Sequence, residues 1–380
     1  MPGSTQRPPD VTPRTAPAAS LWRDERLLQV RPPLGATLLW AALILAAVLA
    51  AAEAFARSPA GARLVELRGV GSRHFQFEVK YDRLERLASA ESVTCLLLGD
   101  STLHQAINPS AVADGLRRQA GADVTCFNFG VRGLSQAVLA PVAEILVEEF
   151  RPDLLVVGVN VTGLQRRLAA DDNDAILESP WVRQRLGDTN WEGWLLDHSL
   201  AYRAFDPFRN WMYLGYLDEL LREIQRWRAM DPYGFLPPRQ VVAAPLPDMT
   251  VPLNQAIARQ LAGFQPSAEN LAGLERTLDL RREGVQVVLV ETPVHQGFLT
   301  LLENGKADYD RGLEAVAEVA RSRGAVFIPS SEIGPTIPLE GWANLNHMNG
   351  TGAELFSAWL TERLAALYQK GRLTPPGGAG

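Results

Sequence analysis

The chain has 380 residues, of which 47% are hydrophobic, enough for one large or two ordinary domains with a substantial core. Its formal net charge of −6 at pH 7, with no basic run to offset it, argues against nucleic acid as the main partner. The two cysteines, Cys95 and Cys126, exclude a disulfide framework and fit no zinc pattern, so we expect both to be buried core residues.

An uncharged apolar run near the N-terminus is long enough to cross a membrane. Residues 1–33 are rich in Pro, Arg, Ser and Thr and lack apolar periodicity, which predicts a disordered tail. The run from Pro32 to Ala52 carries no charge, and about 20 such residues span a bilayer as a helix. We predict one transmembrane helix over residues 34–54. A buried core helix and an uncleaved signal segment, with Ala54-Phe55-Ala56 resembling a cleavage site, are the alternatives.

The charges beside this run do not determine its orientation. Each flank carries three arginines: Arg23, Arg26 and Arg31 before it, and Arg57, Arg63 and Arg68 after it. The positive-inside rule therefore gives a near tie.

The first strand of the predicted sheet ends in a serine. Residues 55–92 are expected to connect the membrane helix to the domain, with a helix over 81–90. The apolar run Val93–Leu98 then stops at Gly99-Asp100-Ser101, which is typical of a buried strand that enters a tight turn. Ligands bind at the carboxyl ends of strands in open α/β sheets, so the Ser101 hydroxyl is well placed for chemistry. Taken alone, the tripeptide is a weak signal, because all three residues favour ordinary turns.

The following elements alternate between helices and strands with short links. Helices are predicted over 109–119, with Asn108 as the N-cap, and over 136–149, and strands over 123–129 and 154–159. This alternation is typical of a doubly wound parallel sheet.

A long insertion interrupts the alternation. Residues 164–266 are rich in Trp, Arg and Pro, with helical pieces expected near 212–228. We interpret them as a mostly helical insertion or cap over the sheet, because a structureless segment of this length is improbable in a compact domain. The alternation resumes with a helix at 267–282, a strand at 285–290, a helix at 308–323, a strand at 325–328 and a closing helix at 351–368.

These elements together predict an α/β domain over residues 93–370. Its centre is a doubly wound, five-stranded parallel sheet between two layers of helices, with the insertion at 164–266. Residues 371–380 are expected to be a disordered tail.

Four polar blocks lie just after predicted strands or before the closing helix: Gly99-Asp100-Ser101, Asn128–Gly133, Gly158-Val159-Asn160 and Asn344-Leu345-Asn346-His347. Their order, Ser, Gly, Asn and His, resembles the SGNH (GDSL-like) hydrolase superfamily. The resemblance covers residues of about 94–160 and 284–366, roughly half of the chain. Any one block would be unconvincing, but four in this order are fairly specific.

The resemblance implies a role for each block. Ser101 would be the nucleophile and His347 the base that accepts its proton. The backbone N–H groups of Ser101 and Gly133 and the side-chain amide of Asn160 would form the oxyanion hole, with Gly130 as the neighbouring candidate for the glycine. No metal or cofactor is implied.

Asn344 departs from the family pattern, which usually has an aspartate three residues before the histidine. An asparagine can orient the imidazole by accepting a hydrogen bond, but it cannot stabilise an imidazolium as a carboxylate does. A Ser-His dyad and an inactive scaffold therefore stay open. Asp100, His104 and His295 are expected near the site as substrate-facing or structural residues.

Each candidate also has an ordinary structural explanation. Ser101 suits a turn, and His347 suits a structural position near a helix start. Asn160 suits a turn as well, and Asn160-Val161-Thr162 fits a glycosylation sequon, a pattern that is frequent by chance.

Two further stretches narrow the resemblance to a cell-envelope subgroup. Glu291–His295 and His347–Ala353 are similar to DltD-like and alginate O-acetylation-type proteins, which work beside a membrane-bound O-acyltransferase. This resemblance implies serine-dependent transfer of an acetyl-type group to an envelope polysaccharide. It also implies a cytoplasmic N-terminus and a catalytic domain on the extracytoplasmic side. The alternatives are a plain carbohydrate esterase and a non-catalytic scaffold that binds a glycan or the acyltransferase.

Overall fold

A computed structural model describes residues 34–165, 170–213 and 217–376 of the chain. The chain divides into two compact units, residues 1–54 and 55–380. The tail predicted at 1–33 lies outside the described residues, as does the end of the tail predicted at 371–380.

Helix α1 (Leu34–Arg57) coincides with the predicted membrane segment. It is long and apolar enough to cross a membrane, and none of its most apolar 18-residue stretch is buried. A membrane anchor and an N-terminal signal sequence both have these properties.

The second unit is built on a five-stranded parallel sheet, which confirms the predicted fold class. The strands are β1 (Cys95–Gly99), β2 (Cys126–Gly130), β3 (Leu154–Val159), β4 (Gln286–Glu291) and β5 (Val326–Ile328). Their spatial order is β2-β1-β3-β4-β5, with every pair parallel. The chain leaves β1 toward β2 on one side and returns to β3 on the other. The carboxyl ends of β1 and β3 therefore flank a topological switch point, where such sheets bind ligands.

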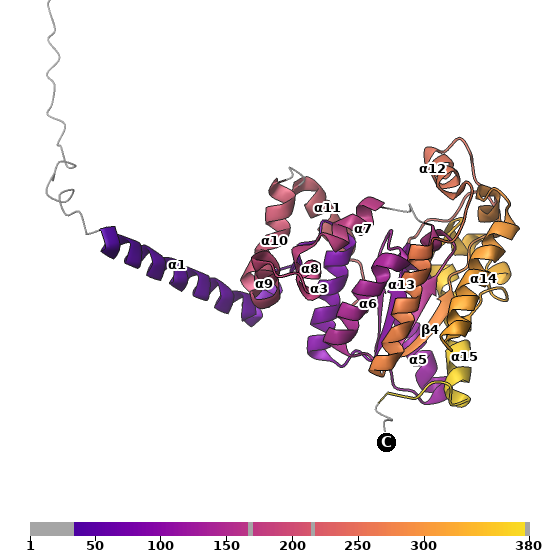
Figure 1. The fold of residues 1–380 in the computed structure, drawn as a ribbon, viewed down its shortest axis with the longest axis horizontal. Helices are drawn as coiled ribbons and strands as arrows, with labels where there is room; N and C mark the ends of the chain where they lie inside the picture. The colour runs from indigo at the N-terminus through magenta and orange to yellow at the C-terminus, as the bar shows by residue number, and fades with distance from the viewer. Residues whose placement is uncertain (1–33, 166–169, 214–216, 377–380) are drawn as a thin grey trace, which may run out of the picture. The chain divides into compact units, whose positions relative to one another are not determined.

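Helices cover both faces of this sheet (Figure 1). Along β1, Leu96 and Leu98 belong to one apolar cluster and Cys95 and Leu97 to the other, because successive side chains of a strand point to opposite faces. The first face is packed by α3 (Phe75–Ala90), α6 (Gln136–Phe150), α13 (Ala268–Asp279) and α14 (Lys306–Ser322). The second is packed by α5 (Pro109–Ala120) and α15 (Gly350–Gln369). Cys95 and Cys126 are both buried and free, as expected.

Helix α3 begins six residues earlier than the sequence indicated. The ring of His74 caps it by accepting a hydrogen bond from the Phe77 backbone N–H, and Phe77 and Tyr81 are buried in the core. Residues from Phe55 onward group with the second unit. The apolar period of α3 is hidden because four polar residues are buried within it: Gln76, Glu78, Lys80 and Asp82.

The insertion between β3 and β4 is mostly helical, as predicted. It comprises α7 (Ala170–Leu177), α8 (Pro180–Arg185), α9 (Trp191–His198), α10 (Leu200–Tyr213), α11 (Leu217–Trp227) and α12 (Pro252–Leu261). Trp181 joins the main core, while Trp227 packs with Phe75 and Val79 of α3. The insertion therefore extends the core on the side of α3.

The remaining elements are short. They are α2 (Pro59–Leu64), α4 (Ser101–Ala106) and five 3₁₀ turns, η1 (Thr162–Leu164), η2 (Leu280–Glu283), η3 (Gln296–Leu301), η4 (Gly334–Thr336) and η5 (Leu339–Gly341). A small antiparallel hairpin, β6 (Trp342–Asn344) and β7 (His347–Met348), precedes α15.

Removal of residues 1–54 tests the division of the chain. The truncated chain should stay in the supernatant and melt in one cooperative transition, because its core is complete without the first unit. The full chain should remain with membranes after carbonate washing. These outcomes are measured by ultracentrifugation and circular dichroism. Aggregation of the truncated chain, with release of the full chain by carbonate, would contradict the membrane-helix prediction.

Candidate active site

The turn after β1 presents Ser101 at the carboxyl edge of the sheet. Ser101 is the first residue of α4, and Asp100 is the N-cap. The Asp100 Oδ1 atom accepts hydrogen bonds from the backbone N–H of Thr102 at 2.9 Å and from its hydroxyl at 2.6 Å. A side-chain cap of this kind satisfies a helix N–H that has no partner within the helix. It fixes the direction in which the chain leaves the strand.

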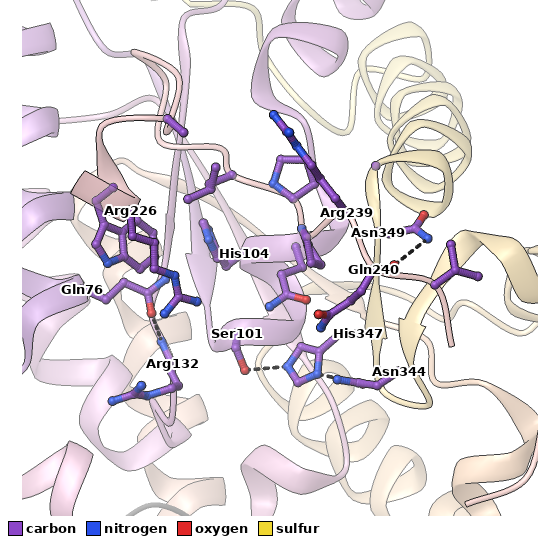
Figure 2. A pocket seen from close by; sticks show the side chains of 18 of the residues that line it. Gln76, Ser101, His104, Arg132, Arg226, Arg239, Gln240, Asn344, His347 and Asn349 are labelled. Atoms are coloured by element: carbon purple, nitrogen blue, oxygen red, sulfur yellow. Dashed lines mark hydrogen bonds between the residues drawn. The ribbon is translucent and has the colours of Figure 1, made fainter. Parts of the chain in front are cut away.

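The β6–β7 hairpin brings His347 to Ser101 across the fold (Figure 2). The distance between Ser101 Oγ and His347 Nε2 is 2.8 Å, although 246 positions separate the residues. Within the hairpin, Asn344 pairs with His347 in the β-ladder, so the two side chains are held next to each other. Asn344 Oδ1 lies 3.0 Å from His347 Nδ1.

The hydrogen bonds of Asn344 fix the tautomer of His347. Asn344 Oδ1 also accepts the backbone N–H of Asn346 at 3.0 Å, so the amide atom facing the ring is the oxygen. We therefore assign the ring proton to Nδ1 of His347, which leaves Nε2 to accept the Ser101 hydroxyl proton. Burial lowers the pKa of His347 below its usual 6.5, partly offset by the negative charge of Asp100. The imidazole is thus neutral at pH 7, as a base must be.

Asn160 lies beside this turn with its amide nitrogen already engaged. It is buried at the end of β3 and donates to Asp100 Oδ2 at 2.6 Å and to Thr102 Oγ1 at 2.8 Å. Its oxygen accepts the Gly163 N–H at 3.0 Å and the Thr162 hydroxyl. An amide nitrogen has two protons, so both are used within the turn in this arrangement. Asn160 here braces the Asp100–Ser101 turn.

Two other predicted residues lie apart from Ser101 and His347. The ring of His295 packs edge-to-face on Trp342, and its Nδ1 accepts the Gly297 N–H at 3.1 Å. His295 lines a separate cavity of about 560 Å³. Gly133 has a φ of 71°, which favours glycine, and its carbonyl accepts the Asn173 amide at 3.0 Å. Neither residue is among the described residues that line the pocket of Ser101.

That pocket measures about 930 Å³. Ser101, Asn344 and His347 lie on its wall together with His104 (Figure 2). Four arginines line it as well, namely Arg73, Arg132, Arg226 and Arg239. Arg239 has no ion-pair partner among the described residues, whereas the other three, each with a largely exposed side chain, form ion pairs with carboxylates. Pairs between exposed charges are weak, so these arginines remain available to a ligand.

Much of the pocket wall comes from segments that carry no recognisable functional motif. Gln76 lies at the start of α3, accepts the Arg132 N–H at 2.8 Å and thereby holds the loop after β2. Trp227 and Arg239 come from the insertion. Within the described residues, no group of three or more His, Cys, Asp or Glu side chains is placed to hold a metal ion.

No protein-family model matches the chain, and the search of curated proteins finds no relative. Solved structures do align with it. A lipase/acylhydrolase from Enterococcus faecalis has 14% identity over 74% of this chain and 98% of its own, with a TM-score of 0.32. A catalytic mutant of an acetylxylan esterase from Geobacillus stearothermophilus has 12% identity over 70% and 92%, with a TM-score of 0.33. A GDSL-like lipase from Bacteroides thetaiotaomicron has 10% identity over 78% and 99%, with a TM-score of 0.30. Likeness this distant assigns no activity to the chain.

The contact between Asn344 and His347 predicts a shift in titration. Asn344→Asp should raise the pKa of His347, because a negative charge beside Nδ1–H stabilises the imidazolium. In the wild type, the pKa should lie below 6.5. Both values are measured by NMR titration of the histidine rings, with His295, in its separate cavity, as the internal control. An unchanged pKa of His347 would show that residue 344 does not contact the ring in solution.

Proposed function

We propose that this chain is a serine-dependent esterase or acyltransferase of the SGNH type. The observation that carries the proposal is the 2.8 Å contact between Ser101 Oγ and His347 Nε2, in a pocket where Asn344 holds the ring in the accepting tautomer. A serine hydroxyl is a weak nucleophile until a neighbouring base accepts its proton.

The geometry supports a two-step acyl transfer. Ser101 Oγ attacks the ester carbonyl while its proton moves to His347 Nε2. His347 then returns the proton to the leaving oxygen as the carbon–oxygen bond breaks, which leaves an acyl group on Ser101. An acceptor hydroxyl or water repeats the sequence in reverse: its proton goes to His347, its oxygen takes the acyl group, and Ser101 regains a proton.

Of the groups that this mechanism requires, the hydrogen-bond donors to the oxyanion are the least complete set. The Ser101 backbone N–H lies in the first turn of α4, where helix N–H groups have no intrahelical partner. Asn160 contributes a donor only if it releases Asp100 or Thr102. The roles of Gly133 and Asn160 in the oxyanion hole therefore stay predictions.

Asn344 is compatible with activity. In the serine-protease triad, changing the aspartate to asparagine lowers turnover by about 10⁴-fold, because the imidazole adopts the wrong tautomer. Here the oxygen of Asn344 faces Nδ1, so the tautomer is the productive one. Only the stabilisation of the imidazolium by a neighbouring carboxylate at this position is lost.

The size and polarity of the pocket favour a carbohydrate ester. A volume of about 930 Å³ lined by arginines, amides and Trp227 suits a glycan better than a fatty acyl chain. With α1 as an anchor, we propose O-acetyl transfer to an envelope polysaccharide, on the extracytoplasmic side and beside a membrane-bound O-acyltransferase. A plain carbohydrate esterase would use the same residues with water as the acceptor.

Substitution of the serine tests the proposal. Ser101→Ala should abolish turnover of p-nitrophenyl acetate and labelling by a fluorophosphonate, while Tm stays nearly unchanged because one hydroxyl at the pocket wall is lost. Ser89→Ala, at an exposed position of α3, is the matched control and should behave as wild type. Activity retained by Ser101→Ala would move the chemistry elsewhere. A wild type that neither labels nor turns over would leave the scaffold alternative.

A further inference from the structure

A fully buried lysine lies directly behind the pocket. Lys80 of α3 has no exposed surface, and its Nζ lies 3.0 Å from Nδ1 of His104. Nζ also donates to the backbone carbonyls of Asn128 and Gly234. No carboxylate among the described residues lies within ion-pair distance of Lys80. Burial of a charge without a counter-ion is costly, so the contacts of this side chain call for an explanation.

The three short contacts of Nζ match the three protons of an ammonium. Two protons go to the carbonyl oxygens, which can only accept. The third points to His104 Nδ1, which must then be the unprotonated nitrogen of the ring. A neutral imidazole has one N–H, so the ring proton of His104 lies on Nε2.

His104 faces the same pocket as the nucleophile. It follows Ser101 by three residues on α4, and residues at this spacing lie on one face of a helix, with Cβ atoms about 5–6 Å apart. Both side chains line the pocket, and Figure 2 shows His104 above Ser101 in that view. The ring of Trp227 packs against His104, with a centroid distance of 5.7 Å. Within the described residues, Nε2 of His104 has no hydrogen-bond partner.

We propose that His104 is the electrophilic counterpart of His347, a neutral imidazole whose Nε2–H donates a hydrogen bond to a sugar oxygen of the bound ester or acceptor. Lys80 is the positioning residue that fixes this tautomer. The inference deepens the proposed function and rests on it. The two rings would then have opposite tautomers: the oxygen of Asn344 accepts from Nδ1–H of His347, whereas Lys80 donates to Nδ1 of His104.

Charge and burial favour this role. Burial, with the positive charge of Lys80 next, lowers the pKa of His104 well below its usual value, so the ring is neutral at pH 7. Burial also lowers the pKa of Lys80, and the negative charge of Asp231 offsets part of this effect. An ammonium behind the ring polarises it and strengthens the Nε2–H donor. A neutral histidine used as an electrophile is an established catalytic arrangement.

The tautomer is tested directly by NMR. In the full chain, labelled with ¹⁵N-histidine in detergent micelles, the His104 ring should show an unprotonated Nδ1 and a protonated Nε2 at pH 7. His104→Gln identifies the signals by their loss, and His347 in the same spectrum should show the opposite pattern. A protonated Nδ1 of His104 would overturn the proposal, whatever the outcome for Ser101. This readout needs no activity, so its failure is distinguishable from a failure of the proposed function.

Kinetics test the consequence with two esters, glucose pentaacetate and p-nitrophenyl acetate. His104→Leu, which has no donor, should lower the ratio of kcat/KM for glucose pentaacetate to kcat/KM for p-nitrophenyl acetate by about tenfold. The reason is that only the sugar ester offers additional oxygens. His104→Gln, which keeps an N–H donor, should restore part of that ratio. Lys80→Met should lower the ratio in the direction of His104→Leu. An unchanged ratio in His104→Leu, or no gain from glutamine over leucine, would overturn the proposal.

Discussion

The site depends on close packing between α4 and the two central strands. A Cβ on Gly99 would lie 2.9 Å from the Leu103 side chain, and one on Gly158 would lie 2.5 Å from it. Only glycine leaves this space, so Leu103 is buried over the ends of β1 and β3. Because α4 is fixed by this contact, the residues on its other face, Ser101 and His104, are directed into the pocket.

The same packing explains how the short helix α4 takes part in two contacts that involve histidine rings. His347 arrives from the hairpin and contacts Ser101, while His104 belongs to α4 and is supported from α3. In each ring, Nδ1 contacts a group behind it, while Nε2 of His347 contacts Ser101 and Nε2 of His104 faces the pocket. The group behind the ring, an amide oxygen in one case and an ammonium in the other, decides whether the facing nitrogen accepts or donates.

The sequence predicted what depends on local apolar patterns and missed what depends on buried polar contacts. Strands β1 and β3 were found because they are continuous apolar runs buried on both faces. Ser101, Asn344 and His347 were found from their order and are brought together. The start of α3 was missed because Gln76, Glu78 and Lys80 are polar yet buried. The engaged amide of Asn160 could not be foreseen either, since the partner of an amide is a matter of three-dimensional geometry.

A carboxylate near His347 is present in this fold, although residue 344 is an asparagine. Asp100, beside Ser101, is held by Thr102 and Asn160, and its negative charge acts on His347 against the effect of burial. Asn344 then has only to set the tautomer, and Asp100 supplies part of the electrostatic support. In the proposed mechanism these two tasks are divided between Asn344 and Asp100, which lie on different elements. The polar contacts of Asn160 belong to this division, because they keep the Asp100 carboxylate in place under the turn.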